Sequence, residues 1–281
     1  MLKKIRSFTE QYAIPAAFIV FIALDFLMLG LGRLLSLLPK TLPLDFLKET
    51  ILMLVPVGIV FFFGFSSAFK KGKFFKGILC CLPFVAWILL TLGVFFSKNL
   101  GNPETSWKPW YLIIYGVFSI FGIGVREECL YRATIQNIVA KKYANSVKGI
   151  WISVIVGAVI FGLCHAPNLF FGMKPLAVLS QVITATFTGL LFGAVYLRSG
   201  SIWALILIHT LTDTASLAQS TFLTSISDIE VANQLSFSWG TLFLHLFFVG
   251  LTAFLLRPSK CKQIYENLCF AGEESEATTR T

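Results

Sequence analysis

Eight apolar runs limit the folds open to this 281-residue chain, because each is nearly long enough to cross a bilayer as a helix. A helix needs about 20 apolar residues to span about 30 Å of hydrocarbon. The chain is 56% hydrophobic and only 13% charged, whereas soluble domains carry about 25% charged residues. We therefore expect an all-α polytopic membrane helical bundle with about eight transmembrane helices. The runs are Ile14 to Leu31, Ile51 to Phe69, Gly77 to Phe96, Trp110 to Val125, Ile150 to Cys164, Leu176 to Leu197, Ser201 to Leu217 and Ser238 to Leu256.

The basic residues predict how the bundle is oriented. The formal net charge is +9. If both termini are cytoplasmic, fifteen of the 23 lysines and arginines fall in inner segments and six in outer segments, and Arg126 and Arg132 complete the set. An excess of this kind is the positive-inside bias, strongest here in the loop KKGKFFK. The charge thus indicates orientation in a cell membrane and attraction to anionic lipid, with no nucleic-acid partner.

The chain shows no internal repeat and no flexible linker, so we expect a single integral membrane domain over 1–281. The run after MLKKIR is too long for a signal peptide and lacks a small-residue cleavage site, which predicts a retained helix. The polar tail 269–281 is expected to be disordered. The six cysteines have no metal or redox spacing and are expected as free thiols.

Within the apolar runs before Trp110, Asp25 is nearly the only ionisable side chain, but such side chains recur in three later helices, which places the expected catalytic core at about 110–217. The stretch GIGVREECLYRATIQN holds four of them within seven positions. Each costs about 2.5 to 3.5 kcal/mol at the centre of a membrane, so partners or a watery cavity are needed. Glu128 and Arg132 are spaced i, i+4 and can pair. Glu127 points about 100° away and has no local partner.

The depth of Glu127 depends on how far its helix continues. ATIQNIVAKKY has no Pro or Gly to stop the helix, so we predict one long helix from about Trp110 to Tyr143. An alternative interpretation is that Glu127 and Glu128 mark the point where this helix leaves the membrane.

Two of the three histidines lie beside aromatic or acidic groups in neighbouring runs. Phe161 and His165 are spaced i, i+4, and so are His209 and Asp213. A lone histidine in an apolar helix is usually a hydrogen-bonded packing residue, but an acid one turn away can orient the ring. Carboxylates can act as general bases. Imidazoles can stabilise an oxyanion or hold zinc. This set of residue types suits peptide hydrolysis.

Three motifs in order, E-E-x-x-x-R, F-x-x-x-H and H-x-x-x-[D/N], resemble those of the type II CAAX prenyl endopeptidase and bacteriocin-processing family of intramembrane proteases, also called the CPBP or Abi family. The resemblance covers about Tyr111 to Ser216. The matching positions are Glu127, Glu128 and Arg132 in the first motif, Phe161 and His165 in the second, and His209 and Asp213 in the third.

The resemblance implies roles for these residues. Glu127 would activate water, Glu128 would support it, and Arg132 would orient the two carboxylates. His165 and His209 would bind a metal ion, Zn²⁺, or stabilise the oxyanion. Asp213 stands where the family has Asn or Asp. A zinc mechanism and a metal-free glutamate mechanism both remain open.

These observations predict an intramembrane endopeptidase, a multi-pass protein of a bacterial cell membrane that cleaves a peptide bond near the bilayer. Its substrate would be a small peptide, as in bacteriocin processing, or the C-terminal segment of a protein. The alternative is a non-catalytic membrane protein that binds a peptide, such as an immunity factor. A proton-relaying transporter is a third possibility, disfavoured because the chain lacks inverted halves with matching broken helices.

Five other residues have simpler interpretations. Asp25 has no basic neighbour within one turn and is expected to be structural. Arg126 is expected to reach lipid phosphate, and His245 to pack in the core. Gly189 and Gly193 have a small-x-x-x-small spacing, which is typical of close helix packing.

Overall fold

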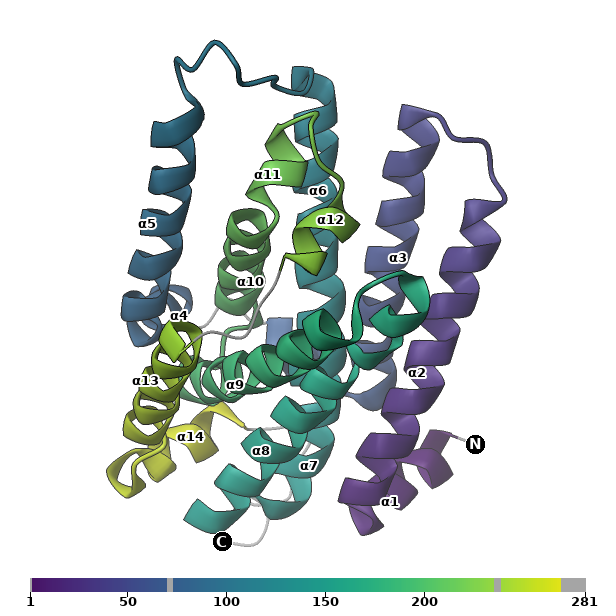
Figure 1. The fold of residues 1–281 in the computed structure, drawn as a ribbon. Coiled ribbons are helices and arrows are strands. Elements are labelled where there is room, and N and C mark those ends of the chain that lie inside the picture. Colours follow the sequence, from purple (N-terminus) through teal and green to yellow (C-terminus); the bar gives the residue numbers. More distant parts are fainter. Residues whose placement is uncertain (1, 70–72, 235–238, 269–281) are drawn as a thin grey trace, which may run out of the picture.

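The computed structural model describes residues 2–69, 73–234 and 239–268 (Figure 1). Within these ranges the regular structure is helical, and the only extended pairing is an isolated bridge between Trp107 and Leu223. The all-α prediction is therefore confirmed. The expected disordered tail, 269–281, lies outside the described residues.

The helices follow the apolar runs, with short helices between and beside them. In the described part of the chain, five segments are apolar and long enough to cross a membrane by length and composition: α2, α3, α5, α8 continued through η3, and α9. Two shorter apolar helices are α10 and the part of α13 from Phe243 to Leu255. The protein is thus a multi-pass membrane protein. In chain order the elements are α1 (Leu2–Gln11), α2 (Ala13–Ser36), α3 (Leu42–Phe63), η1 (Ser66–Phe69), α4 (Phe74–Cys80), α5 (Leu82–Asn99), α6 (Trp110–Glu127), η2 (Glu128–Gln136), α7 (Asn137–Tyr143), α8 (Val147–Leu163), η3 (Ala166–Phe171), α9 (Pro175–Ser199), α10 (Ile202–Ser216), α11 (Ala218–Phe222), α12 (Asp228–Asn233), α13 (Trp239–Leu255), η4 (Pro258–Lys260) and α14 (Cys261–Asn267).

Two of the apolar runs form helices whose boundaries differ from those expected. The third run is divided at Cys81 into α4 and α5, and Pro83 lies in the first turn of α5, where a missing N–H leaves no helical bond unmade. The helix over the second run, α3, begins at Leu42 because the polar segment before Ile51 also adopts helix, and it ends at Phe63, before Gly64 in the left-handed conformation. That extension places Asp45 and Glu49 on α3.

The long helices run in two main directions (Figure 1). Helices α2, α3, α5, α6 and α10 are roughly parallel, while α9 crosses them steeply and packs along α8 and α13. The connection from α5 to α6 lies at the upper end of Figure 1, and α1 and α14 both lie toward the lower end. The two described ends of the chain are therefore on the same side of the bundle.

The segment from Trp110 to Tyr143 is continuously helical, which confirms the predicted long helix. Its middle third was not predicted: η2 is a π-helix, and all nine of its residues are buried. The Thr134 hydroxyl donates to the carbonyl of Cys129, five residues earlier. Because π-turns close i→i+5, they rotate the following side chains relative to an α-helix, and they are frequent at functional sites.

Small residues bring the site-bearing helices together. A Cβ at Gly124 on α6 would lie 2.9 Å from the Thr210 hydroxyl and 3.2 Å from the Ile206 carbonyl of α10. Gly189 and Gly193 on α9 similarly face Ala158 of α8 and Gln136 of η2, so the expected close packing is confirmed. These contacts fix α6 and η2 against α9 and α10.

Candidate active site

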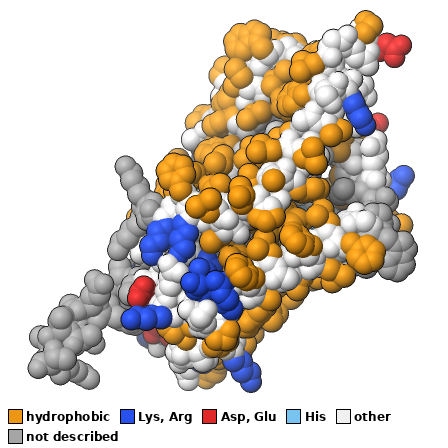
Figure 2. Space-filling view, turned by 90° about the vertical axis from the view of Figure 1, so that its left-hand side faces the viewer, with side chains coloured by type: hydrophobic (Ala, Val, Ile, Leu, Met, Phe, Trp, Pro, Cys, Tyr) orange, Lys and Arg blue, Asp and Glu red, His pale blue; other side chains and the backbone are white. Residues whose placement is uncertain are grey.

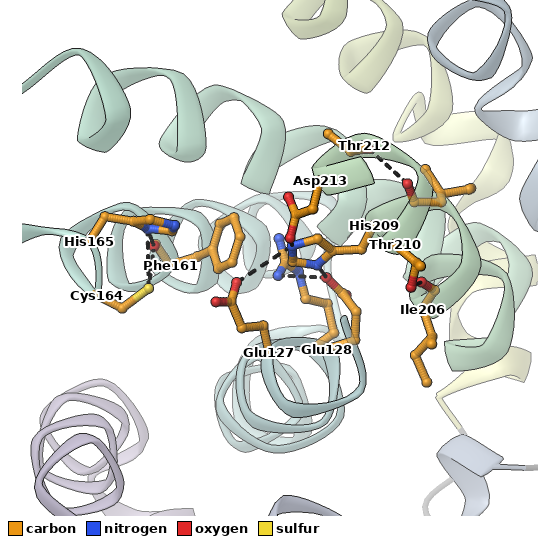
Figure 3. A network of polar contacts seen from close by, with 12 residues as sticks. Glu127, Glu128, Phe161, Cys164, His165, Ile206, His209, Thr210, Thr212 and Asp213 are labelled. Atoms are coloured by element: carbon orange, nitrogen blue, oxygen red, sulfur yellow. Dashed lines mark hydrogen bonds and ion pairs between the residues drawn. The ribbon is translucent and has the colours of Figure 1, made fainter. Parts of the chain in front are cut away.

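The candidate site lies where α6 passes into η2 and faces α10 (Figure 3). Glu127 is the last residue of α6 and Glu128 the first of η2, while His209 and Asp213 come from α10. Phe161 is near the end of α8, and His165 follows α8. The structure thus gathers all three sequence motifs around one point between helices distant in sequence.

A buried ion pair forms the base of the site. The Arg132 guanidinium donates from Nη1 to Glu128 Oε1 at 3.0 Å, and both side chains are almost completely buried. The same oxygen lies 2.7 Å from His209 Nδ1. Glu128 therefore accepts from both groups, which fixes Nδ1 as a donor and sets the orientation of the ring. The i, i+4 pairing predicted from sequence is present.

Aromatic rings enclose this pair. The Arg132 guanidinium carbon lies 4.0 Å from the centroid of the Phe161 ring and 5.4 Å from that of Phe192. The His209 ring packs edge-on against the same two rings, at 5.9 and 5.7 Å. Cation–π contact is strongest where water is excluded, so these rings help to hold a charge inside the bundle. Phe192 was not identified from the sequence, where it is one phenylalanine among 29.

The other side of His209 is more open. Its Nε2 lies 3.6 Å from Glu127 Oε2 and 3.4 Å from Asp213 Oδ2. The Glu127 and Asp213 side chains are 24% and 26% exposed, against 6% for His209. A proton on Nε2 would face two carboxylates that can accept it, whereas a bare lone pair would be repelled by both. Glu127 and Asp213 are the parts of the site that a substrate and water can reach.

His165 lies apart from His209, on the other side of the Phe161 ring (Figure 3). The Phe161 ring contacts both imidazoles edge-on, with centroids 5.4 and 5.9 Å away. His165 Nδ1 is directed toward the Phe161 carbonyl at 3.0 Å and the Cys164 sulfur at 3.3 Å. His165 therefore lies at the edge of the site, and the Phe161 ring separates it from His209.

This arrangement does not fit a zinc ion held jointly by His165 and His209. The phenyl ring lies between the two imidazoles, and His209 Nδ1 is already engaged by Glu128. In the described ranges, no three His, Cys, Asp or Glu side chains group as metal ligands. Zinc sites in proteins need three or four such ligands around one point.

Two further acidic residues lie beside the site. Asp25, on α2, is close enough to Glu127 and His165 to interact electrostatically with both. The sequence feature that could have identified Asp25 is its isolation in an apolar run, because an acidic residue inside a membrane span is a candidate functional residue by default. Glu49, on α3, pairs with Arg126 at 3.2 Å, so Arg126 has a protein partner rather than the expected lipid phosphate. No spacing in the sequence relates Glu49 to Arg126.

His245, the third histidine, lies away from this cluster on α13. Its Nδ1 is 2.6 Å from the Thr241 carbonyl, and its ring packs near Phe187 and Phe248. This agrees with the core-packing role expected for it.

Comparison with known proteins gives one family match. Residues 108–215 match the family model described as Type II CAAX prenyl endopeptidase Rce1-like. A 70-residue segment is 34% identical to the undecaprenyl phosphate-alpha-4-amino-4-deoxy-L-arabinose arabinosyl transferase of Wigglesworthia glossinidia brevipalpis, covering 25% of this chain and 11% of that protein. No solved structure matches the chain. The matched segment is thus a small part of the transferase, whereas the family match spans the three motifs.

Proposed function

We propose that this protein is an intramembrane endopeptidase. The premise is that residues 108–215 belong to the type II CAAX prenyl endopeptidase Rce1-like family. The catalytic core is the segment 110–217 within one integral membrane domain. It contains Glu127, Glu128, Arg132, His165, His209 and Asp213.

One observation carries the proposal: His209 has its Nδ1 on the buried Glu128 and its Nε2 beside the accessible Glu127 and Asp213. Such a ring is held rigidly at one nitrogen and is free to act at the other. In a hydrolase this provides a donor of fixed direction next to a carboxylate that can accept a proton.

The reaction follows from these positions. Water attacks the scissile carbonyl carbon while Glu127 takes a proton from it. The carbonyl electron pair moves to oxygen, and His209 Nε2–H donates to this oxyanion. When the intermediate collapses, the carbon–nitrogen bond breaks and the leaving nitrogen takes the proton from Glu127. Water is consumed, and the products are a carboxyl terminus and an amine.

The remaining residues position these two groups. Arg132 holds Glu128, and Glu128 holds His209. Asp213 Oδ2 lies 3.4 Å from Nε2, where its charge favours a proton on this nitrogen until the substrate carbonyl arrives. His165 lies at the rim, where it can hydrogen-bond the substrate or the oxyanion.

The substrate we propose is a membrane-associated peptide or the C-terminal segment of a protein, bound within the bilayer of a bacterial cell. The location of the site among apolar helices supports this, because a wholly soluble substrate would have to enter the membrane. Processing of a bacteriocin-type peptide is the specific biological role that we favour.

Glu127→Gln tests the proposal. Cleavage of a fluorogenic membrane-anchored peptide by the purified protein in detergent should fall by about 10²- to 10⁴-fold, the usual contribution of a general base. The thermal midpoint should be unchanged, since Glu127 is partly exposed. Glu10→Gln, the same change at an exposed ion pair, is the matched control and should retain full activity.

Full cleavage by Glu127→Gln would refute the mechanism. If the wild type binds the peptide without cleaving it, and a folded variant carrying both Glu127→Gln and His209→Gln binds equally well, the peptide-binding alternative is correct.

A further inference from the structure

A second group of buried charges lies away from the candidate active site, between α4, the C-terminal end of α9 and α14. Lys76 Nζ and Arg198 Nε are both buried and have no hydrogen-bond partner among the described residues. Arg198 is only 6% exposed. Its Nη1 donates to the neutral Gln263 side chain, which leaves its charge uncompensated.

The fold brings these cations together through close packing. A Cβ at Gly77 would lie 2.4 Å from the Ala204 Cβ and 3.4 Å from the Ser199 hydroxyl, so α4 is in direct contact with the junction of α9 and α10. On α14, Asn267 donates to the Leu197 and Arg198 carbonyls at 2.8 and 3.0 Å. Its own side-chain oxygen accepts from Lys73 at 3.2 Å.

The Lys and Arg side chains that act on this group within the described ranges repel one another. Arg198, Lys73 and Lys260 all act on Lys76 as like charges, and Arg257 acts on Arg198. Among the described residues, no carboxylate acts on either Lys76 or Arg198, and only the Cys80 thiol has the opposite effect. Burial, followed by the charge of Arg198, lowers the pKa of Lys76.

Buried cations without a counter-charge are costly, and proteins retain them where an anion binds. Figure 2 views the molecule from the left of Figure 1 and shows Lys and Arg side chains gathered mostly toward the lower left of this face, below a broad hydrophobic surface. A membrane protein meets lipid phosphates at such a boundary. Basic pockets between helices on the inner side typically bind anionic headgroups.

We propose that Lys76 and Arg198, with Lys73, Arg257 and Lys260 around them, form a binding site for a phosphate group. The source is the headgroup of an anionic phospholipid or inorganic phosphate. Arginine and lysine together suit this ligand, because the guanidinium offers directed donors and the ammonium a compact charge. Access is open at the edge of this group, since Arg257 and Lys260 are only partly buried. Binding there stabilises the contact of α4 with α9 and α14.

The test is thermal unfolding of the full-length protein in a neutral detergent. Separate samples receive phosphatidylglycerol, phosphatidylcholine or inorganic phosphate. Phosphatidylglycerol should raise the midpoint of the wild type by several degrees, and phosphatidylcholine should not. A comparable increase with inorganic phosphate identifies free phosphate as the ligand, whereas an increase with the anionic lipid alone identifies the headgroup.

Lys76→Met and Arg198→Gln are the informative variants. Each should weaken the apparent affinity for the stabilising anion by about fivefold or more, the effect of one basic residue near an anionic surface. Without added anion, Lys76→Met should unfold at a higher temperature than the wild type, because a repelled buried charge is removed. Lys148→Gln removes an exposed cation of α8 and should leave the response unchanged.

The proposal is overturned if neither anion shifts the midpoint, or if Lys148→Gln reduces the response as much as Lys76→Met does. A lower midpoint for anion-free Lys76→Met would also contradict it, since that result means the ammonium already has a partner. All three readouts are independent of peptidase activity.

Discussion

At the residue scale, the decisive feature is a charge pair with no access to water. Glu128 and Arg132 are 0% and 2% exposed, and His209 adds a second donor to the same Glu128 oxygen. Removing one member of a buried pair leaves the other charge unpaired, whereas replacing both by apolar groups removes both desolvation penalties. The pair therefore contributes to orientation of His209 more than to net stability.

Glu128→Gln should accordingly lower the free energy of unfolding by about 3 to 5 kcal/mol, because Arg132 loses its counter-charge. The double variant Glu128→Leu, Arg132→Met should recover most of that loss while remaining inactive. Unfolding by increasing SDS in mixed micelles measures both values.

Glu10→Gln supplies the comparison, since it breaks an ion pair with Lys141 that is substantially exposed. Exposed pairs contribute about 0 to 1 kcal/mol. Equal losses in Glu10→Gln and Glu128→Gln would show that burial of Glu128 has no energetic consequence.

At the element scale, the site depends on the distance between α6 and α10. Gly124 lies one turn before Glu127, and the backbone of α10 occupies the space where a side chain would be. The π-turns of η2 begin at the next residue after Glu127. Together, the small residue and the changed helical register direct Glu127 and Glu128 to the two nitrogens of one imidazole.

Gly124→Ala should therefore separate α6 from α10 and lower peptidase activity by at least about tenfold, with a stability loss of about 1 to 3 kcal/mol from overpacking. Initial rates and unfolding midpoints measure the two effects.

Gly116→Ala is the matched control on the same helix, because its new Cβ would meet Thr221 only at an ordinary contact distance of 3.4 Å. Equal losses in both variants would show that the contact with α10 is not the cause, since Ala itself favours helix more than Gly does.

At the scale of the whole molecule, the distribution of charge sets the orientation in the membrane. The first and last described helices lie toward the same end of the bundle, opposite the connection from α5 to α6 (Figure 1). The positive-inside bias predicts that this shared end is cytoplasmic.

Single cysteines at matched asparagines test this orientation in a variant whose six native cysteines are replaced by alanine. Asn102, between α5 and α6, and Asn145, between α7 and α8, are both exposed. A membrane-impermeant maleimide applied to intact cells should label Asn102→Cys and leave Asn145→Cys unlabelled until the cells are opened. Labelling in the reverse order would show that the topology is the inverse of the one predicted.

The local features of this protein could be predicted because they depend on neighbours in the sequence. The apolar runs determined which segments are helices, since each must satisfy its backbone hydrogen bonds internally in lipid. The spacing of Glu128 and Arg132 determined their pairing, because residues four apart share a helix face. The absence of Pro and Gly after Arg132 determined the length of the helix that carries Glu128 and Arg132.

The tertiary structure alone decided the contacts between helices. Whether His209 would meet His165 or Glu128 depended on how α8 and α10 rotate about their axes, and the Phe161 ring separates the two imidazoles. The pairing of Arg126 with Glu49 also depends on helices far apart in sequence, and so does the position of Lys76 Nζ and Arg198 Nε, which have no hydrogen-bond partner in the described part of the chain. Periodicity specifies which face of a helix is polar, but packing of whole helices determines which polar groups meet.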